Sequence, residues 1–247
     1  MFLTCLCAIA IVLHPVLHWL KPQCLEGLCV TARLAKRATR PNGIRSFISI
    51  EIPRPIREQM VRALEPLKSV RGKFNWSSTN NLHITLKFLG DCTRGRLELI
   101  SKRLADIAAR HRPFEMTFGG VGVFPSHAAP RIIWLGVKDG VEQLLKLSKD
   151  VTDSMEEIGF KKESRPFRPH ITLARIKYLS SRDALKASIE ALPQVHIDGM
   201  TADHIFLMRS QLRTKGAIYT VIERLCLSGG ETHAEAQPPS AEQTPVG

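Results

Sequence analysis

Apolar side chains follow two different spacings along the chain, and the spacings alternate from one segment to the next. Residues 45–52 alternate polar and apolar positions and stop at Pro53, which is typical of a strand with one buried face. Residues 94–110 instead place an apolar residue at every third or fourth position, which predicts an amphipathic helix. Its apolar stripe comprises Leu97, Ile100, Leu104 and Ile107.

The same two criteria predict the remaining elements and indicate an α+β protein. We expect strands at 45–52, 83–89, 114–123, 131–137, 170–176, 194–199, 204–211 and 217–227. We expect helices at 54–70, 94–110, 141–158 and 182–192. Gly90 is expected to end the second strand, and Gly159 the third helix. These elements predict one folded domain over residues 45–228.

The two ends of the chain lack this pattern. Residues 2–13 are apolar apart from Thr4 and two cysteines, but the run is shorter than the roughly 20 residues of a membrane span. No Lys or Arg precedes it, so the basic start of an export signal is missing. Residues 1–44 are therefore an anchor or export signal, an ordered or loose extension, or the product of a start assigned too far upstream. Residues 229–247 have no aromatic side chain and are expected to be a disordered tail.

Composition restricts the choice of binding partner more than it restricts the choice of fold. The shares of hydrophobic residues (44%) and charged residues (23%) are ordinary for a globular protein, but the net charge is +12. A basic excess favours a polyanion, first nucleic acid and second anionic lipid. The six cysteines form no Cys-x-x-Cys pair or zinc-finger spacing, so we expect no metal and no cofactor. A cytoplasmic monomer with reduced thiols is the default expectation, with anchoring or export through residues 1–20 as the alternative.

The tetrapeptide His-Ile-Thr-Leu occurs twice, at residues 83–86 and 170–173. Because residues i and i+2 of a strand face the same side, each copy presents an imidazole and a hydroxyl on one surface, with Ile and Leu on the other. If the copies arise from a duplication and meet across a groove, two imidazoles meet there. Such a pair suits one general acid and one general base acting on the same phosphate.

Other histidines provide an internal control. His196 and His204 also lie on predicted strands, but neither has a hydroxyl residue two positions later. A single histidine in a strand is more often structural than catalytic, and a duplication that serves packing alone would also repeat the motif. The full repeat at His83 and His170 favours the catalytic interpretation, because imidazole titrates near neutral pH and can act as acid or base there.

Phosphate binding needs further polar groups beside the two rings. The hydroxyls of Thr85 and Thr172 and the guanidinium of Arg175 are the candidates for holding non-bridging oxygens. Arg175 lies three residues after Thr172, so strand geometry decides whether it reaches the groove or is a solvated cation at the strand end.

Four sequence blocks resemble the two-histidine (2H) phosphoesterase superfamily, and within it the LigT/ThpR branch. That branch contains RNA 2′,3′-cyclic phosphodiesterases, formerly called 2′–5′ RNA ligases. The resemblance extends over about residues 45–228, and residues 1–44 have no counterpart in it. The blocks are residues 45–53, residues 81–90, residues 119–125 with 130–137, and residues 167–175, and the second and fourth contain the two motifs.

The resemblance implies a bilobal fold of two pseudo-symmetric lobes, each with an antiparallel sheet and helices, and a groove between them that holds the active site without a metal. It implies hydrolysis of a terminal 2′,3′-cyclic phosphate of RNA, for example on tRNA-like fragments, to a 2′-phosphate, with reversible 2′–5′ ligation as a related reaction. His170 would be the general base and His83 the general acid. The phosphate would be bound by Thr85, Thr172 and Arg175. Phe47 and Phe167 would either stack on a base or belong to the core.

Two other functions remain open from the sequence. The chain could be an RNA-end binding module that grips a terminal phosphate without hydrolysing it. It could also be an enzyme of the same type that acts on a small nucleotide, such as a cyclic phosphate of an ADP-ribose compound. The basic excess favours a polymeric substrate, whose affinity should fall with rising salt concentration.

Overall fold

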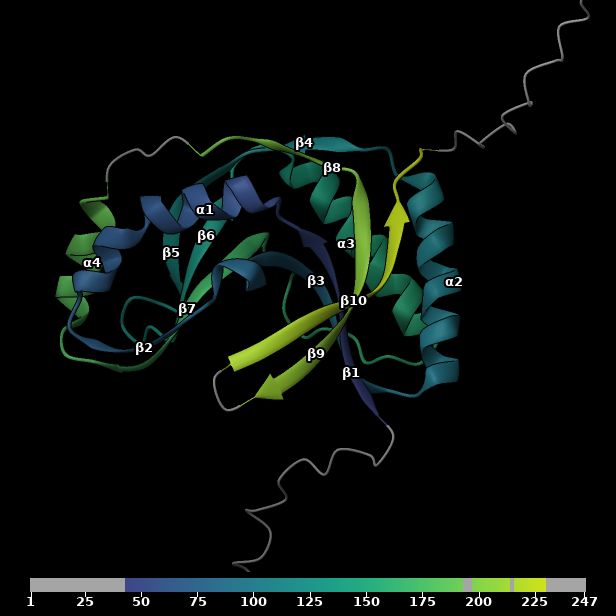
Figure 1. Ribbon diagram of the computed structural model, residues 1–247, viewed down its shortest axis with the longest axis horizontal. Coiled ribbons are helices and arrows are strands. Elements are labelled where there is room, and N and C mark those ends of the chain that lie inside the picture. The colour runs from purple at the N-terminus through teal and green to yellow at the C-terminus, as the bar shows by residue number, and fades with distance from the viewer. Residues whose placement is uncertain (1–42, 193–196, 214–215, 230–247) are drawn as a thin grey trace, which may run out of the picture. The chain divides into compact units, whose positions relative to one another are not determined.

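The computed structural model describes residues 43–192, 197–213 and 216–229, and most of its strands form one antiparallel sheet (Figure 1). The strand order is β10-β9-β1-β3-β7-β6-β5, and β2 also pairs with β7. The bounds are β1 Ile44–Glu51, β2 Gly72–Trp76, β3 His83–Cys92, β5 Phe118–Phe124, β6 Ile132–Val137, β7 His170–Leu179, β9 His204–Arg213 and β10 Gly216–Cys226. A separate pair joins β4 (Phe114–Met116) to β8 (Met200–Ala202). The expected α+β class is confirmed.

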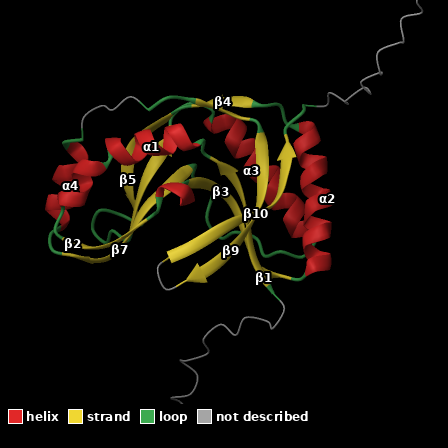
Figure 2. Ribbon diagram, viewed as in Figure 1, coloured by secondary structure: helices red, strands yellow, loops and turns green. Residues whose placement is uncertain are grey.

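Four α-helices accompany the sheet within the described residues (Figure 2). They are α1 (Arg54–Ala63), α2 (Arg94–Arg110), α3 (Val141–Glu157) and α4 (Arg182–Glu190). Helix α2 contacts α3, β9 and β10, and α3 contacts β3, whereas α1 and α4 both contact the 3-10 helix η2 (Glu65–Ser69). The apolar stripe expected on α2 is buried, so that periodicity predicted both the helix and the face it turns to the core.

The large sheet consists of two four-stranded halves that meet at one point. Strands β10, β9, β1 and β3 form one half, and β2, β7, β6 and β5 form the other. Between β3 and β7 a single residue pair, Ile84 with Ile171, is in register. These halves are the two lobes of a two-lobed fold, and each contains one His-Ile-Thr-Leu strand.

The expected helix at 54–70 ends early. Helix α1 stops at Ala63, and the chain continues from Glu65 as the 3-10 helix η2. Pro66 has no N–H to donate to the preceding turn, and its ring would clash with the carbonyl of Arg62 in a continuous α-helix. The prediction of one uninterrupted helix was therefore wrong at Pro66.

Three strand predictions need correction. The expected strand at 114–123 is divided at Thr117, whose backbone bonds to Asp139 and Lys138, so that β4 and β5 enter different sheets. Gly90 does not end β3. It adopts φ 73° next to an irregularity in the pairing of β3 with β1, and the strand continues to Cys92. Of the expected strand at 194–199, residues 194–196 lie outside the described residues, and 197–199 are not in a strand. Strand β2 was not predicted, because its apolar signal is only Phe74 and Trp76.

The core lies between the sheet and its helices. Ile48 and Ile50 of β1 are 0% and 1% exposed, and Ile84 and Ile171 of the two motifs are both 0% exposed. None of the helices in the described residues is long and apolar enough to cross a membrane. Residues 1–42, on which the extension was predicted, lie outside the described residues, as do residues 230–247 of the expected tail.

Candidate active site

The two His-Ile-Thr-Leu motifs meet where the lobes join. His83 is the first residue of β3, His170 is the first residue of β7, and the isoleucine that follows each one forms the single register pair between these strands. Because Ile84 and Ile171 are fully buried, His83 and His170 lie on the opposite, accessible face. Burial is the main cause of the lowered pKa of His83, and the charge of His170 lowers it further, which agrees with this placement. The duplicated motif therefore brings both rings to one place.

A β-bulge decides where Arg175 points. In the pairing of β6 with β7, Trp134 lies opposite Thr172 and Ile133 opposite Ala174, which leaves Leu173 as an extra residue. One extra residue reverses the alternation of faces, and Arg175 therefore falls on the same face as His170 and Thr172. Its charge lowers the pKa of His170, which agrees with this placement. Arg175 is exposed and can bind an anion beside His170.

The equivalent bulge in β3 places a different side chain at the corresponding position. Ser49 lies opposite Thr85 and Ile48 opposite Lys87, so Leu86 is the extra residue. The residue that joins His83 and Thr85 on the accessible face is then Phe88, which is 63% exposed. The two lobes thus share the bulge, but one presents a guanidinium and the other an aromatic ring.

Backbone carbonyl groups fix the tautomer of both histidines. Nδ1 of His83 donates to the carbonyl oxygen of Asn81 at 2.8 Å, and Nδ1 of His170 donates to that of Arg168 at 2.7 Å. A carbonyl oxygen can only accept, so the hydrogen in each bond is on Nδ1, and Nε2 is left for proton transfer. Nε2 of His83 lies 2.9 Å from the hydroxyl oxygen of Thr85, which couples the two groups of the first motif.

Burial disfavours the protonated form of both imidazoles in the ligand-free protein. It lowers the pKa of His83 to about 4, opposed by the bond to Asn81 and assisted by the charge of His170. Burial also lowers the pKa of His170, with a further contribution from the charge of Arg175. An anion bound between the rings would raise both pKa values, because an opposite charge favours the protonated form.

Aromatic rings pack against both imidazoles. The ring of Phe47 lies 4.9 Å from that of His83, and the ring of Tyr219 lies 5.3 Å from it at 87°. Phe124 packs edge-on against His170 at 5.1 Å. Tyr219 and Phe124 were not identified from the sequence, because their proximity to the histidines depends on strand pairing between distant segments. The only signal was aromatic character, of Tyr219 within the expected strand at 217–227 and of Phe124 one residue beyond the expected strand at 114–123.

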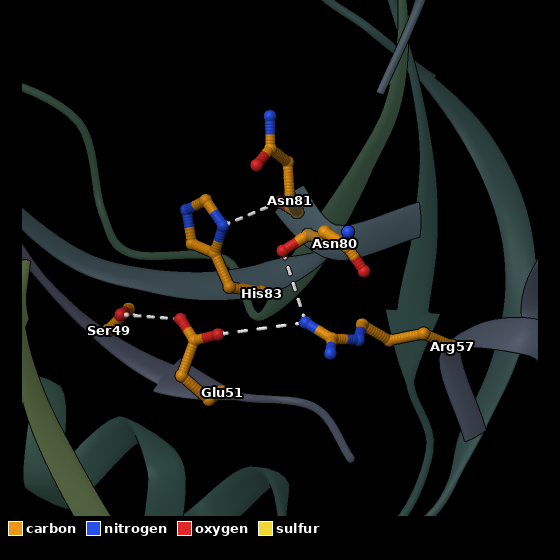
Figure 3. A network of polar contacts seen from close by, with 6 residues as sticks. All are labelled: Ser49, Glu51, Arg57, Asn80, Asn81 and His83. Atoms are coloured by element: carbon orange, nitrogen blue, oxygen red, sulfur yellow. Dashed lines mark hydrogen bonds and ion pairs between the residues drawn. The ribbon is translucent and has the colours of Figure 1, made fainter. Parts of the chain in front are cut away.

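A polar network supports the turn before His83 (Figure 3). Nη1 of Arg57 donates to the carbonyl oxygen of Asn80 at 3.1 Å and lies 3.9 Å from Oε2 of Glu51, whose Oε1 accepts from Ser49. Burial raises the pKa of Glu51, opposed by the Ser49 hydrogen bond and the charge of Arg57. Since Asn80 immediately precedes Asn81, Arg57 holds the peptide segment whose carbonyl fixes His83. This network was not predicted.

The two candidate stacking residues, Phe47 and Phe167, both pack against other parts of the protein. Phe47 is 3% exposed, so it supports His83 from the core and offers no surface to a nucleobase. Phe167 is half-buried and packs against the hydrophobic core. In the described part of the chain, no group of three or more His, Cys, Asp or Glu side chains is arranged to hold a metal ion.

Comparisons with known proteins agree with this geometry. The LigT like Phosphoesterase family matches the chain twice, at residues 50–134 and 135–219, and each match contains one of the two motifs. Two proteins named RNA 2′,3′-cyclic phosphodiesterase are similar to the chain. The one from Methanothermobacter thermautotrophicus is 33% identical over 73% of this chain and 97% of its own length. The one from Aquifex aeolicus is 33% identical over 75% and 98%.

Solved structures have a similar fold. A crystal structure of a Thermus thermophilus protein has a TM-score of 0.65 and 27% identity, and the match covers 75% of this chain and 99% of that one. The structure of E. coli LigT complexed with 3′-AMP has a TM-score of 0.62 and 25% identity, with coverage of 76% and 99%. The chain therefore spans nearly the full length of these proteins, and about a quarter of it extends beyond them.

Proposed function

Because the chain belongs to the LigT-like phosphoesterase family, we propose that it hydrolyses the terminal 2′,3′-cyclic phosphate of RNA to a 2′-phosphomonoester. The observation that carries this proposal is the meeting of two motif strands at Ile84 and Ile171, which brings two carbonyl-fixed imidazoles to one accessible face. The names of the similar proteins supply the substrate class.

His170 acts as the general base and His83 as the general acid. Water attacks phosphorus as its proton passes to Nε2 of His170, and the bond from phosphorus to the ribose 3′ oxygen breaks. Nε2 of His83 gives its proton to that oxygen, so the product is a 2′-phosphate with a free 3′-hydroxyl. Each proton transfer contributes about 10²- to 10⁴-fold to the rate.

Phosphate oxygens are bound by the groups beside the rings. The hydroxyls of Thr85 and Thr172 share the face of their histidines, and the bulge at Leu173 turns Arg175 to the same face. A guanidinium there stabilises the negative charge that increases on the non-bridging oxygens in the transition state. Arg175 is therefore assigned to phosphate binding, and its alternative role as a solvated cation at the strand end is set aside.

The acid must acquire its proton when substrate binds. A pKa of about 4 leaves His83 neutral at pH 7 in the free protein. The phosphodiester anion beside the ring favours the imidazolium and raises this pKa, so that binding and protonation of His83 are coupled. The bond between His83 and Thr85 allows for both states, because a hydroxyl can donate to the neutral nitrogen or accept from the protonated one.

Two competing functions are less consistent with the site. A module that only grips phosphate needs cations and hydroxyls, and it gains nothing from two imidazoles with Nε2 kept free by backbone carbonyl groups. The net charge of +12 favours a polymeric substrate over a small nucleotide, because a polymer offers several phosphates to bind.

Product analysis tests the proposal directly. The purified full-length chain is incubated, in excess chelator, with a short RNA that ends in a 2′,3′-cyclic phosphate. We expect complete conversion to the 2′-phosphate, identified by phosphorus NMR and by mass. A 3′-phosphate as the product, or an unreacted cyclic end with tightly bound RNA, would contradict the proposal.

A further inference from the structure

The segment that connects α3 to β7 carries an unusual density of cations. It comprises residues 160–169, here named the basic loop, and it ends one residue before His170. Its charged side chains are Lys161, Lys162, Arg165, Arg168 and the single acid Glu163, and all of them are exposed. The excess positive charge therefore leads directly to the proposed general base.

A buried lysine of the other lobe fixes the start of the basic loop. Lys87 of β3 is 2% exposed, and a buried ammonium group needs a partner. Its Nζ donates to the carbonyl oxygen of Lys161 at 3.3 Å, and Oε1 of Glu163 lies 3.9 Å away. Because β3 also carries His83, this contact ties the basic loop to both motif strands.

Two further contacts hold the ends of the basic loop. Arg96 of α2 donates to the carbonyl oxygen of Ile158 at 3.2 Å, and its guanidinium lies 4.0 Å over the ring of Phe160. At the other end, the carbonyl oxygen of Arg168 accepts from His170. The backbone of the basic loop is therefore held at both ends, and its cations extend from this held segment.

The cations of the basic loop are unpaired, in contrast to several on the helices. Arg54, Lys149 and Lys186 each pair with an acid four residues later on the same helix. Within the described residues, no acidic side chain forms an ion pair with any cation of the basic loop. Their charge is thus available to an external anion.

We propose that the basic loop binds the phosphodiester backbone of the RNA strand whose cyclic end occupies the active site. This inference rests on the proposed function and deepens it, because it names a single-stranded polymer, and not a mononucleotide, as the preferred substrate. Several cations in sequence match several phosphates in sequence, and each contact releases counterions, so affinity falls as salt concentration rises. A cyclic mononucleotide has a single phosphate, which the active site binds, so it has no further phosphate for the basic loop.

A triple variant of the full-length chain, Lys161→Gln, Lys162→Gln and Arg165→Gln, tests the proposal. Its matched control is Lys102→Gln, Arg110→Gln and Lys146→Gln, which removes two lysines and one arginine from exposed positions of α2 and α3. Each protein is assayed with a short single-stranded RNA ending in a cyclic phosphate and with uridine 2′,3′-cyclic phosphate, between about 50 and 200 mM salt. Binding of a 2′-phosphate-ended RNA is measured by fluorescence anisotropy.

The loop variant should raise KM for RNA about tenfold at the lower salt concentration, and the slope of log affinity against log salt should shrink by about 0.7 for each phosphate that is no longer neutralised. Its activity on the cyclic mononucleotide should equal that of the wild type, which also shows that it is folded. The control variant should resemble the wild type with both substrates.

If the loop variant keeps the wild-type salt slope and RNA affinity, the inference is overturned while the proposed function stands. If the wild type hydrolyses neither substrate, the proposed function fails, and the anisotropy comparison still decides whether the basic loop binds RNA.

Discussion

The two motif strands have the same tetrapeptide and the same bulge, but they give their histidines different surroundings. His83 is enclosed by Phe47 and Tyr219, and Nε2 contacts Thr85. Among the described residues, His170 has one aromatic neighbour, Phe124, and it follows the basic loop. The repeat therefore determines where the imidazoles lie, whereas the neighbouring strands determine how readily each ring takes a proton. Under the proposed mechanism, this difference would allow two identical motifs to act as acid and base.

Removal of either imidazole should have the largest effect. His83→Ala and His170→Ala are each expected to lower kcat by about 10²- to 10⁴-fold, because each removes one proton transfer. The measurement is steady-state turnover of a cyclic-phosphate RNA, with thermal unfolding to confirm that both variants fold. Wild-type turnover in either variant would show that the histidine removed there transfers no proton in the reaction.

The next largest effect should come from Arg175. Arg175 and Phe88 are the residues that follow the bulges in β7 and β3 and differ between the two lobes. Arg175→Gln should lower kcat/KM by about 10²-fold, since it removes a charged donor to the phosphate. Phe88→Leu, the matched change in the other lobe, should alter kcat/KM by only a few-fold, because leucine keeps the apolar character of the position and no charge is removed. Equal decreases in the two variants would contradict the assignment of phosphate binding to the Arg175 guanidinium.

The protonation states can be followed by NMR of imidazole nitrogens labelled with nitrogen-15. In the ligand-free protein, His83 should gain its proton only as the pH falls through about 4, the value to which burial lowers its pKa. A bound nucleoside 2′-phosphate should raise the pKa of His83, because the anion favours the imidazolium. A ligand-free pKa at the ordinary value, or no upward shift with the nucleotide, would remove the proposed coupling between binding and protonation.

The network behind His83 should have a smaller effect on turnover than the loss of either imidazole or of Arg175. Arg57→Met removes the donor to the carbonyl of Asn80 and should lower kcat about tenfold, with KM unchanged, because the acid is less well oriented. Arg54→Met is the control, since Arg54 is exposed and pairs only with Glu58. The nitrogen-15 shift of His83 Nδ1 distinguishes a change in orientation from a change in stability. If Arg57→Lys fails to restore part of both the shift and kcat, Arg57 is not a positioning residue.

Local periodicity was sufficient for much of the fold. Helix α2 begins and ends at the predicted residues, and β3 and β7 begin at the two histidines, because the pattern of apolar residues within each segment is enough to define it. The two-lobed architecture was predicted from the repeated tetrapeptide and from the family resemblance. His83 and His170 were therefore available as candidates from the sequence.

What the sequence left open depends on register between distant strands. Leu173 is an extra residue only in relation to Trp134 and Ile133 of β6, and that relation decides whether Arg175 reaches the site. Tyr219 likewise becomes a neighbour of His83 only after β10, β9 and β1 have paired. A pattern within one segment carries no information on such pairings.

The central claim is that His83 supplies the proton to the leaving 3′ oxygen and His170 removes the proton from water. A cyclic substrate whose bridging 3′ oxygen is replaced by sulfur tests it most directly, because a thiolate departs without protonation. We expect His83→Ala to regain most of the wild-type rate on this substrate, while His170→Ala stays impaired. Equal impairment of both variants, or rescue of His170→Ala instead, would contradict the claim.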